Sequence, residues 1–129
     1  MANTVLVVDD DQLMHRLFQH HLERAGYRVV TALNGREGID VATRELPQVI
    51  VMDIMMPDID GLAALKELKK MDITKAIPVI MITANSHHIS RQESEESGAA
   101  LFLTKPFSPT QLLNEIRRLM PGESQSQSA

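Results

Sequence analysis

Side chains that can bind a metal ion and a phosphate group lie at the ends of apolar runs in this 129-residue chain. They are two neighbouring acids, a third acid, a threonine and a lysine: Asp9, Asp10, Asp53, Thr83 and Lys105. Three carboxylates brought together repel one another and need a counter-charge, which a hard divalent cation such as Mg²⁺ supplies. A carboxylate beside such an ion can attack phosphorus and form an aspartyl phosphate. The residue types therefore predict a magnesium-dependent phosphoryl site, provided that the fold brings them together.

The lysine and the threonine suit the same chemistry. Phosphoryl transfer depends mainly on positioning and on neutralising the equatorial oxygens of the phosphoryl group. Lys105 would supply a point charge and Thr83 a hydrogen-bond donor to those oxygens. Ala84, which follows the threonine, would leave room for an incoming phosphodonor.

The apolar run that ends at Asp53 identifies the central structural element. Residues 49–53 read Val-Ile-Val-Met-Asp and lie between Pro47 and Pro57, an interval too short for a helix. An uninterrupted apolar run of this length is typical of a central strand covered on both faces. Asp53 then stands at the carboxyl end of a buried strand, where open α/β sheets place their chemistry.

The rest of the chain alternates between strand and helix patterns. Strands are predicted at 5–8, 27–32, 49–53, 79–83 and 99–103, and helices at 12–25, 34–46, 61–71, 85–97 and 108–120. Five strands alternating with five helices imply an α/β protein with a doubly wound parallel sheet. The strand ends then share one edge, where the candidate residues meet. We expect one domain, 1–121, and a disordered Ser/Gln tail, 122–129.

Composition excludes several classes of protein. With no cysteine there is neither a disulfide framework nor a thiolate metal site. A net charge of −4 without a run of basic residues argues against direct nucleic-acid binding, and 3% aromatic residues are too few to stack bases or a flavin. The start of the chain has no basic signal region, and no apolar run reaches about 18 residues. We therefore expect a soluble, cytoplasmic protein that does not enter a membrane.

Four segments together resemble the receiver domain of two-component response regulators. They are Val-Leu-Val-Val-Asp-Asp-Asp at 5–11, Val-Met-Asp-Ile-Met-Met-Pro-Asp-Ile-Asp-Gly at 51–61, Ile-Thr-Ala at 82–84 and Phe-Leu-Thr-Lys-Pro-Phe at 102–107. Their order and spacing make the resemblance specific, and it extends from about Thr4 to Met120. It implies a flavodoxin-like receiver fold with the strand order 2-1-3-4-5.

The resemblance also implies a role for each site residue. Asp53 would be the phosphoacceptor, and Lys105 and Thr83 would hold the phosphoryl group. Asp10 and Asp53 would ligate Mg²⁺ directly, with Mn²⁺ as a possible substitute. Asp9 would act through water, and the backbone carbonyl of Met55 would be a further ligand.

A switch and a set of partners follow from the same resemblance. Thr83 and Phe102 would be the switch residues, and the bond before Pro106 would be cis. The phosphodonor would be a sensor histidine kinase or a histidine phosphotransfer protein. Phosphorylation would change the face formed by the fourth helix, fifth strand and fifth helix, which would bind an output partner or a second copy of the chain. The domain would catalyse only its own phosphorylation and dephosphorylation, so it would not be an enzyme.

Two features of the sequence depart from this picture or add to it. The segment 85–97 has Ile89 as its one apolar residue after Ser86, so the fourth helix is predicted to be short or shifted. The strand 99–103 would then be open to a partner. Asp11 is predicted to cap the first helix and is left outside the site.

Two other functions remain open from the residues. The Asp-x-Asp within Asp9-Asp10-Asp11 also suits a Mg²⁺-dependent phosphohydrolase of the haloacid dehalogenase type, in which Asp9 would be the nucleophile. That class needs a second domain or a longer chain. A flavodoxin-like electron carrier shares the fold but has a Ser/Thr-rich phosphate loop after its first strand, where this chain has three acids.

Overall fold

The computed structural model describes residues 3–54, 61–83, 92, 95–105 and 107–120, and its centre is one parallel sheet. The five strands are β1 (Thr4–Val8), β2 (Arg28–Ala32), β3 (Val49–Asp53), β4 (Val79–Thr83) and β5 (Leu101–Thr104). Their order is β2-β1-β3-β4-β5 and every pairing is parallel. The predicted doubly wound sheet is therefore confirmed. Because the strands are parallel, all their carboxyl ends lie at one edge of the sheet.

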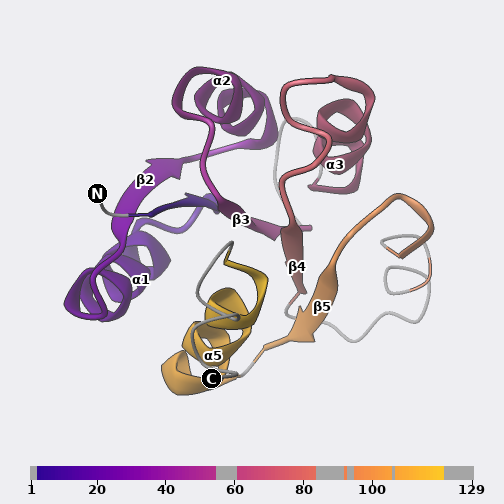
Figure 1. Ribbon diagram of the computed structural model, residues 1–129. Coiled ribbons are helices and arrows are strands. Elements are labelled where there is room, and N and C mark those ends of the chain that lie inside the picture. Colours follow the sequence, from indigo (N-terminus) through magenta and orange to yellow (C-terminus); the bar gives the residue numbers. More distant parts are fainter. Residues whose placement is uncertain (1–2, 55–60, 84–91, 93–94, 106, 121–129) are drawn as a thin grey trace, which may run out of the picture.

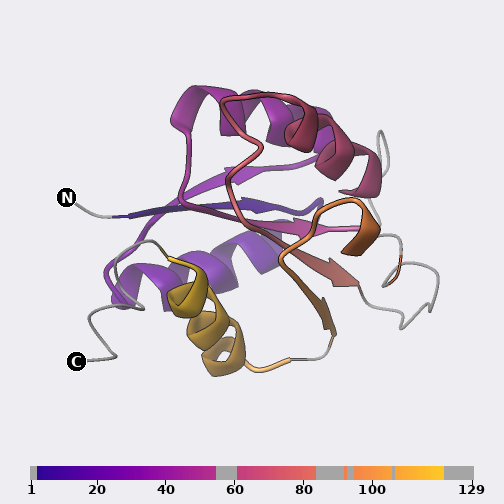
Figure 2. The same ribbon diagram turned by 45° about the vertical axis from the view of Figure 1, so that its right-hand side comes forward.

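Helices cover both faces of this sheet (Figures 1 and 2). The described residues form α1 (Gln12–Arg24), α2 (Gly35–Glu45), α3 (Gly61–Lys70) and α5 (Pro109–Leu119). In Figure 2 the sheet separates α2 and α3 on one face from α1 and α5 on the other. The predicted fourth helix, and with it the prediction that this helix is short or shifted, lies mainly outside the described residues. None of the helices described is both long enough and apolar enough to span a membrane.

Polar side chains fix the start of three helices. Asp11 caps α1 and accepts a hydrogen bond from the backbone of Leu13, and Asn34 caps α2 in the same way. Ser108 caps α5, with Pro109 as the first helical residue. Such side chains satisfy backbone N–H groups that have no partner inside the helix. The predicted helix starts at these positions are confirmed.

The core has two layers, one on each face of the sheet, because successive side chains of a strand point to opposite faces. The α2–α3 core comprises Leu6, Val8, Ala32, Val41, Ala42, Ile50, Met52, Ile54, Ala64, Leu65, Leu68, Ile77, Val79, Met81 and Phe102. The α1–α5 core comprises Val5, Val7, Phe18, Leu22, Tyr27, Val29, Val49, Val51, Ile80, Ile82, Leu103, Leu112, Ile116 and Met120. Strands β1, β3 and β4 are buried along their whole length, as their uninterrupted apolar runs predict.

The last strand begins two residues later than predicted. Gly98 has φ 105°, a left-handed conformation that turns the chain toward the sheet. Ala99 and Ala100 lie between this turn and the strand. Of the two, Ala100 bonds to the neighbouring strand: its backbone N–H donates to the carbonyl oxygen of Val79 at 2.9 Å. Regular pairing with β4 starts at Leu101. The apolar pattern at 99–103 thus overestimated the strand at its start.

One glycine sets the distance between α2 and β1. A Cβ atom at Gly38 would lie 2.9 and 3.0 Å from the two methyl carbons of Val8. We expect Gly38→Ala to lower the free energy of unfolding by about 1–3 kcal/mol, because a packed core resists added volume. Urea unfolding measures this change. Arg36→Ala, an exposed change in the same helix, should stay within about 0.5 kcal/mol of the wild type, and an equal effect of both would contradict this account.

Candidate metal centre

The three predicted acids meet at the carboxyl edge of two neighbouring strands. Asp9 follows β1 and Asp53 ends β3, and these strands pair directly. Asp9 is 3% exposed and Asp53 is 7% exposed, whereas Asp10 is exposed. One carboxylate oxygen from each of the three lies within 4.8 Å of the other two. We call these three residues the acid cluster.

Backbone groups hold Asp9 in place. Its own N–H donates a hydrogen bond of 3.1 Å to the carbonyl oxygen of Ala32, the last residue of β2. Its Oδ1 accepts a hydrogen bond from the backbone N–H of Asp11 at 2.9 Å, and the Asp11 side chain in turn accepts one from Leu13 at 2.9 Å. The start of α1 is thereby tied to the acid cluster. The sequence assigned Asp11 only a capping role, and its backbone contact with Asp9 was missed.

Lys105 brings one positive charge to the acid cluster. Its Nζ lies 3.7 Å from Asp9 Oδ2 and 3.5 Å from Asp53 Oδ2. Its backbone N–H donates to the carbonyl oxygen of Thr83 at 2.7 Å, which fixes the lysine beside the end of β4. One ammonium group faces three carboxylates, so these residues alone leave the cluster with excess negative charge.

The protonation of Asp9 reflects this shortage of positive charge. Burial raises the pKa of Asp9 above its ordinary value of 3.8, and the negative charges of Asp53 and Asp10 raise it further. The hydrogen bond from the Asp11 backbone and the charge of Lys105 oppose that rise in pKa without cancelling it. The folded protein therefore favours the neutral form of Asp9 more than the unfolded chain does.

We predict that Asp9→Asn stabilises the metal-free protein at neutral pH. A raised folded-state pKa means that the native state loses stability as pH rises from about 3.8 through the raised value, and asparagine removes that loss. The melting temperature should rise by on the order of 3 °C at neutral pH, and the difference should vanish in acid. Thermal unfolding followed by circular dichroism measures both. A variant that melts below the wild type at neutral pH would contradict this account.

Asp11→Asn is the matched control for that substitution. Asparagine caps helices about as well as aspartate, and the Asp11 backbone N–H that bonds to Asp9 is unchanged. Its melting temperature should not show the same rise with pH.

Thr83 and Phe102, the predicted switch residues, lie on one face of adjacent strands. Thr83 ends β4 and is buried. Phe102 is opposite Met81 in the pairing of β4 with β5, and both belong to the α2–α3 core. Because Thr83 follows Met81 by two residues, it points to the same face. The two side chains therefore lie on the same face of the sheet, and their roles as switch residues stay predictions.

A close backbone approach also shapes the position of Asp53. The N–H of Gly61, the first residue of α3, donates to the carbonyl oxygen of Ile54 at 2.9 Å. A Cβ atom at Gly61 would overlap the backbone carbonyl oxygen of Asp53. The sequence pattern indicated only that this glycine starts a helix. In the sequence, the Asp-Gly pair at 60–61 was the one feature that could have indicated this close approach.

The donor set fits a hard divalent cation. Carboxylate oxygens are the ligands that Mg²⁺ prefers, and it uses one or two of them while retaining water and phosphate oxygens. The acid cluster offers three carboxylates, and the positive charge of the cation would offset the repulsion that, together with burial, raises the pKa of Asp9. The further predictions for Met55 and for the bond before Pro106 fall outside the described residues.

Comparisons with known proteins agree over most of the chain. The family model of the response regulator receiver domain matches residues 5–117. The chain is 36% identical over 120 residues to the alkaline phosphatase synthesis transcriptional regulatory protein PhoP of Bacillus subtilis, covering 93% of this chain and 49% of that protein. It is 40% identical over 119 residues to the response regulator PleD of Caulobacter vibrioides, covering 92% and 26%. The chain thus spans about half or a quarter of these relatives' length.

Solved structures show the same likeness. The chemotaxis protein CheY4 of Vibrio cholerae superposes with a TM-score of 0.87 at 33% sequence identity, over 93% of this chain and 100% of that chain. A CheY-like receiver domain from Methanospirillum hungatei gives a TM-score of 0.89 at 26% identity, over 98% and 99%. The likeness therefore extends over nearly the whole chain.

Proposed function

This chain belongs to the response regulator receiver family, and we propose that Asp53 accepts a phosphoryl group from a phosphohistidine in the presence of Mg²⁺. The observation that carries the proposal is the meeting of the acid cluster with Lys105 at one edge of the sheet. Asp53 is the last residue of the central strand, at the carboxyl edge where parallel sheets place their chemistry.

Each residue of the site has a defined task in the transfer. An oxygen of Asp53 forms a bond to phosphorus as the donor's nitrogen–phosphorus bond breaks, and the imidazole nitrogen retains that electron pair and takes up a proton. Lys105 neutralises charge on the phosphoryl oxygens, and Thr83 donates a hydrogen bond to one of them. Asp10 and Asp53 bind Mg²⁺ directly and Asp9 binds it through water. Bound there, Mg²⁺ supplies the positive charge that the carboxylates and the phosphoryl oxygens both require.

The phosphorylated form acts as a signal. When Thr83 moves to the phosphoryl group it vacates space on the face that it shares with Phe102, and the aromatic ring can follow. This change biases an existing equilibrium of the surface formed by the fourth helix, β5 and α5. The partners are a sensor histidine kinase or histidine phosphotransfer protein as donor, and an output partner or a second copy of the chain as receiver of the signal.

The names of the relatives support a role in signalling. PhoP is named a transcriptional regulatory protein and PleD a response regulator, and this chain covers only part of each. We propose that the domain regulates such an output by modifying only itself. Its own phosphorylation and dephosphorylation are then the reactions that it catalyses, and no outside substrate is turned over.

Phosphorylation by acetyl phosphate tests the proposal. The protein is incubated with acetyl phosphate and Mg²⁺, the acyl phosphate is trapped by borohydride reduction, and the modified peptide is identified by mass spectrometry. We expect modification of Asp53 and none when EDTA removes the metal. Modification of Asp9 would instead support a phosphohydrolase of the haloacid dehalogenase type, and no modification at any acid would refute the proposal.

A further inference from the structure

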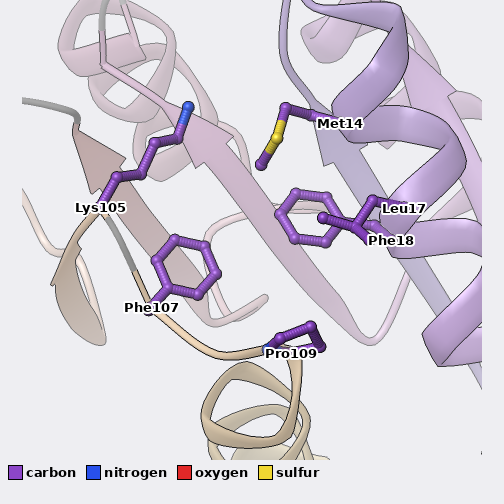
Figure 3. A pocket seen from close by; sticks show the side chains of 6 residues that line it. All are labelled: Met14, Leu17, Phe18, Lys105, Phe107 and Pro109. Carbon is purple, nitrogen blue, oxygen red and sulfur yellow. The ribbon is translucent and has the colours of Figure 1, made fainter.

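An apolar cavity of about 240 Å³ lies beside the acid cluster, between α1 and the segment that leads from β5 into α5. Figure 3 shows the side chains that line it, three from α1, two from that segment and one from the first residue of α5. They are Met14, Leu17, Phe18, Lys105, Phe107 and Pro109. Lys105 is therefore common to the cavity and to the site of the proposed phosphorylation.

The lining favours an aromatic occupant. The rings of Phe18 and Phe107 are nearly parallel, with an interplanar angle of 10° and centroids 6.3 Å apart. The thioether of Met14 extends toward the same space (Figure 3). Aromatic rings gain contact energy beyond their buried area from neighbouring rings and from sulfur. A flat ring would meet both kinds of neighbour in this cavity.

The volume indicates what size of group the cavity can hold. An apolar cavity of about 150 Å³ is known to accept benzene, whereas pockets for drug-sized ligands measure about 300–1,000 Å³. A cavity of about 240 Å³ lies between these values. It can hold a single ring with one small substituent, and because it is partly open to solvent, that molecule would stay partly exposed.

Charge further restricts the choice. Lys105 lines the cavity with its aliphatic chain and points its nitrogen away from the Phe107 ring (Figure 3), toward carboxylates 3.5 and 3.7 Å away. An anion that reached the ammonium group would also approach Asp9 and Asp53, and a cation would meet the ammonium group itself. An uncharged molecule is repelled neither by the carboxylates nor by the ammonium group. A carbonyl oxygen on such a molecule could accept a hydrogen bond from Lys105.

We propose that this cavity binds a small uncharged aromatic molecule with a carbonyl or amide substituent, and that the ligand acts on the phosphoacceptor site through Lys105. The second part rests on the proposed function. A ligand oxygen bonded to Lys105 competes with Asp9 and Asp53 for the ammonium group and withdraws it from the phosphoryl group that it would neutralise. The ligand therefore slows phosphorylation, and phosphorylation of Asp53 in turn weakens binding of the ligand.

Benzamide is a suitable probe for binding. In protein labelled with ¹³C at the methionine methyl groups, we expect the Met14 signal to move and saturate with a Kd on the order of 1 mM. Leu17→Trp should abolish the movement by filling the cavity from its mouth, where Leu17 is 41% exposed and tolerates a larger side chain. Leu13→Trp is the matched control, because it lies one turn earlier, is 70% exposed and does not line the cavity.

Phosphorylation by acetyl phosphate is then followed with and without saturating benzamide. The rate should fall at least about threefold in the wild type and in Leu13→Trp and stay unchanged by benzamide in Leu17→Trp. A Met14 signal that benzamide does not move overturns the binding site. A Met14 signal that instead moves with protein concentration assigns the cavity to a second copy of the chain and also overturns it.

The two parts of the proposal can fail separately. Saturable binding with no change in the phosphorylation rate overturns the link through Lys105. Absence of phosphorylation without benzamide refutes the proposed function, whereas the Met14 titration still decides whether the cavity binds the ligand.

Discussion

Replacing Lys105 by methionine will slow phosphorylation by acetyl phosphate on the order of 100-fold and will tighten Mg²⁺ binding. The two effects have opposite signs because the lysine has two neighbours. Its ammonium group would neutralise the phosphoryl oxygens during transfer, so its loss raises the barrier. It also lies 3.5–3.7 Å from two acids of the cluster, so in the resting protein it repels a bound cation.

Both effects are measurable on the same protein. Rates come from mass spectrometry of the intact chain over time, and Mg²⁺ affinity comes from isothermal titration calorimetry. We expect Mg²⁺ to bind about tenfold more tightly to Lys105→Met. Lys66→Met, which removes an exposed lysine from α3, should change neither quantity. Weaker Mg²⁺ binding by Lys105→Met would mean that the lysine organises the cluster instead of competing within it.

Gly61→Ala is the second change with a large expected effect. A methyl group at this position would overlap the Asp53 carbonyl oxygen and lie 2.9 Å from the Asp53 carbonyl carbon and the Ile54 Cα. Backbone atoms cannot rotate away as side chains do, so β3 or α3 must shift. We expect a loss of at least about 3 kcal/mol in the free energy of unfolding and a loss of phosphorylation that persists where the variant is folded.

Gly38→Ala provides the comparison for this substitution. It also adds one methyl group at a close approach between a helix and the sheet, but the atoms that it meets are the methyl carbons of Val8. A side chain can give by a few tenths of an ångström, so this variant should be less destabilised and should still be phosphorylated. Equal losses in stability and in phosphorylation for both variants would contradict the special role of Gly61.

The sheet and the acid cluster were predictable because they depend on short-range patterns. Uninterrupted apolar runs indicate buried parallel strands, and the residue that ends such a run stands at the carboxyl edge of the sheet. Asp9, Asp53 and Lys105 each end or follow a run of this kind, so the pattern places all three at one edge of the sheet. The strand order that brings them close together came from the resemblance to the receiver family. Helix starts at Asp11 and Ser108 were predictable for the same reason, since a cap bonds to residues two or three positions away.

Features that depend on the distance between elements were not predictable. The approach of Gly61 to the Asp53 backbone depends on how α3 sits against β3. The cavity beside Lys105 depends on the distance between α1 and the segment before α5. The pattern of apolar residues along the chain does not indicate that distance. The bond from the Asp11 backbone to Asp9 depends on the backbone conformation between β1 and α1, which the residue types alone do not specify. These contacts decide how the site is held, whereas the pattern decides only which residues meet there.

Mg²⁺ binding to variants of the acid cluster tests the central claim most directly. Isothermal titration calorimetry should give one Mg²⁺ per wild-type chain, and binding at least about tenfold weaker for Asp10→Asn and for Asp53→Asn, because each removes a proposed direct ligand. Asp11→Asn keeps the helix cap and the backbone bond to Asp9, so it should bind like the wild type. Wild-type affinity in Asp53→Asn would contradict the claim that the phosphoacceptor and the metal share one site.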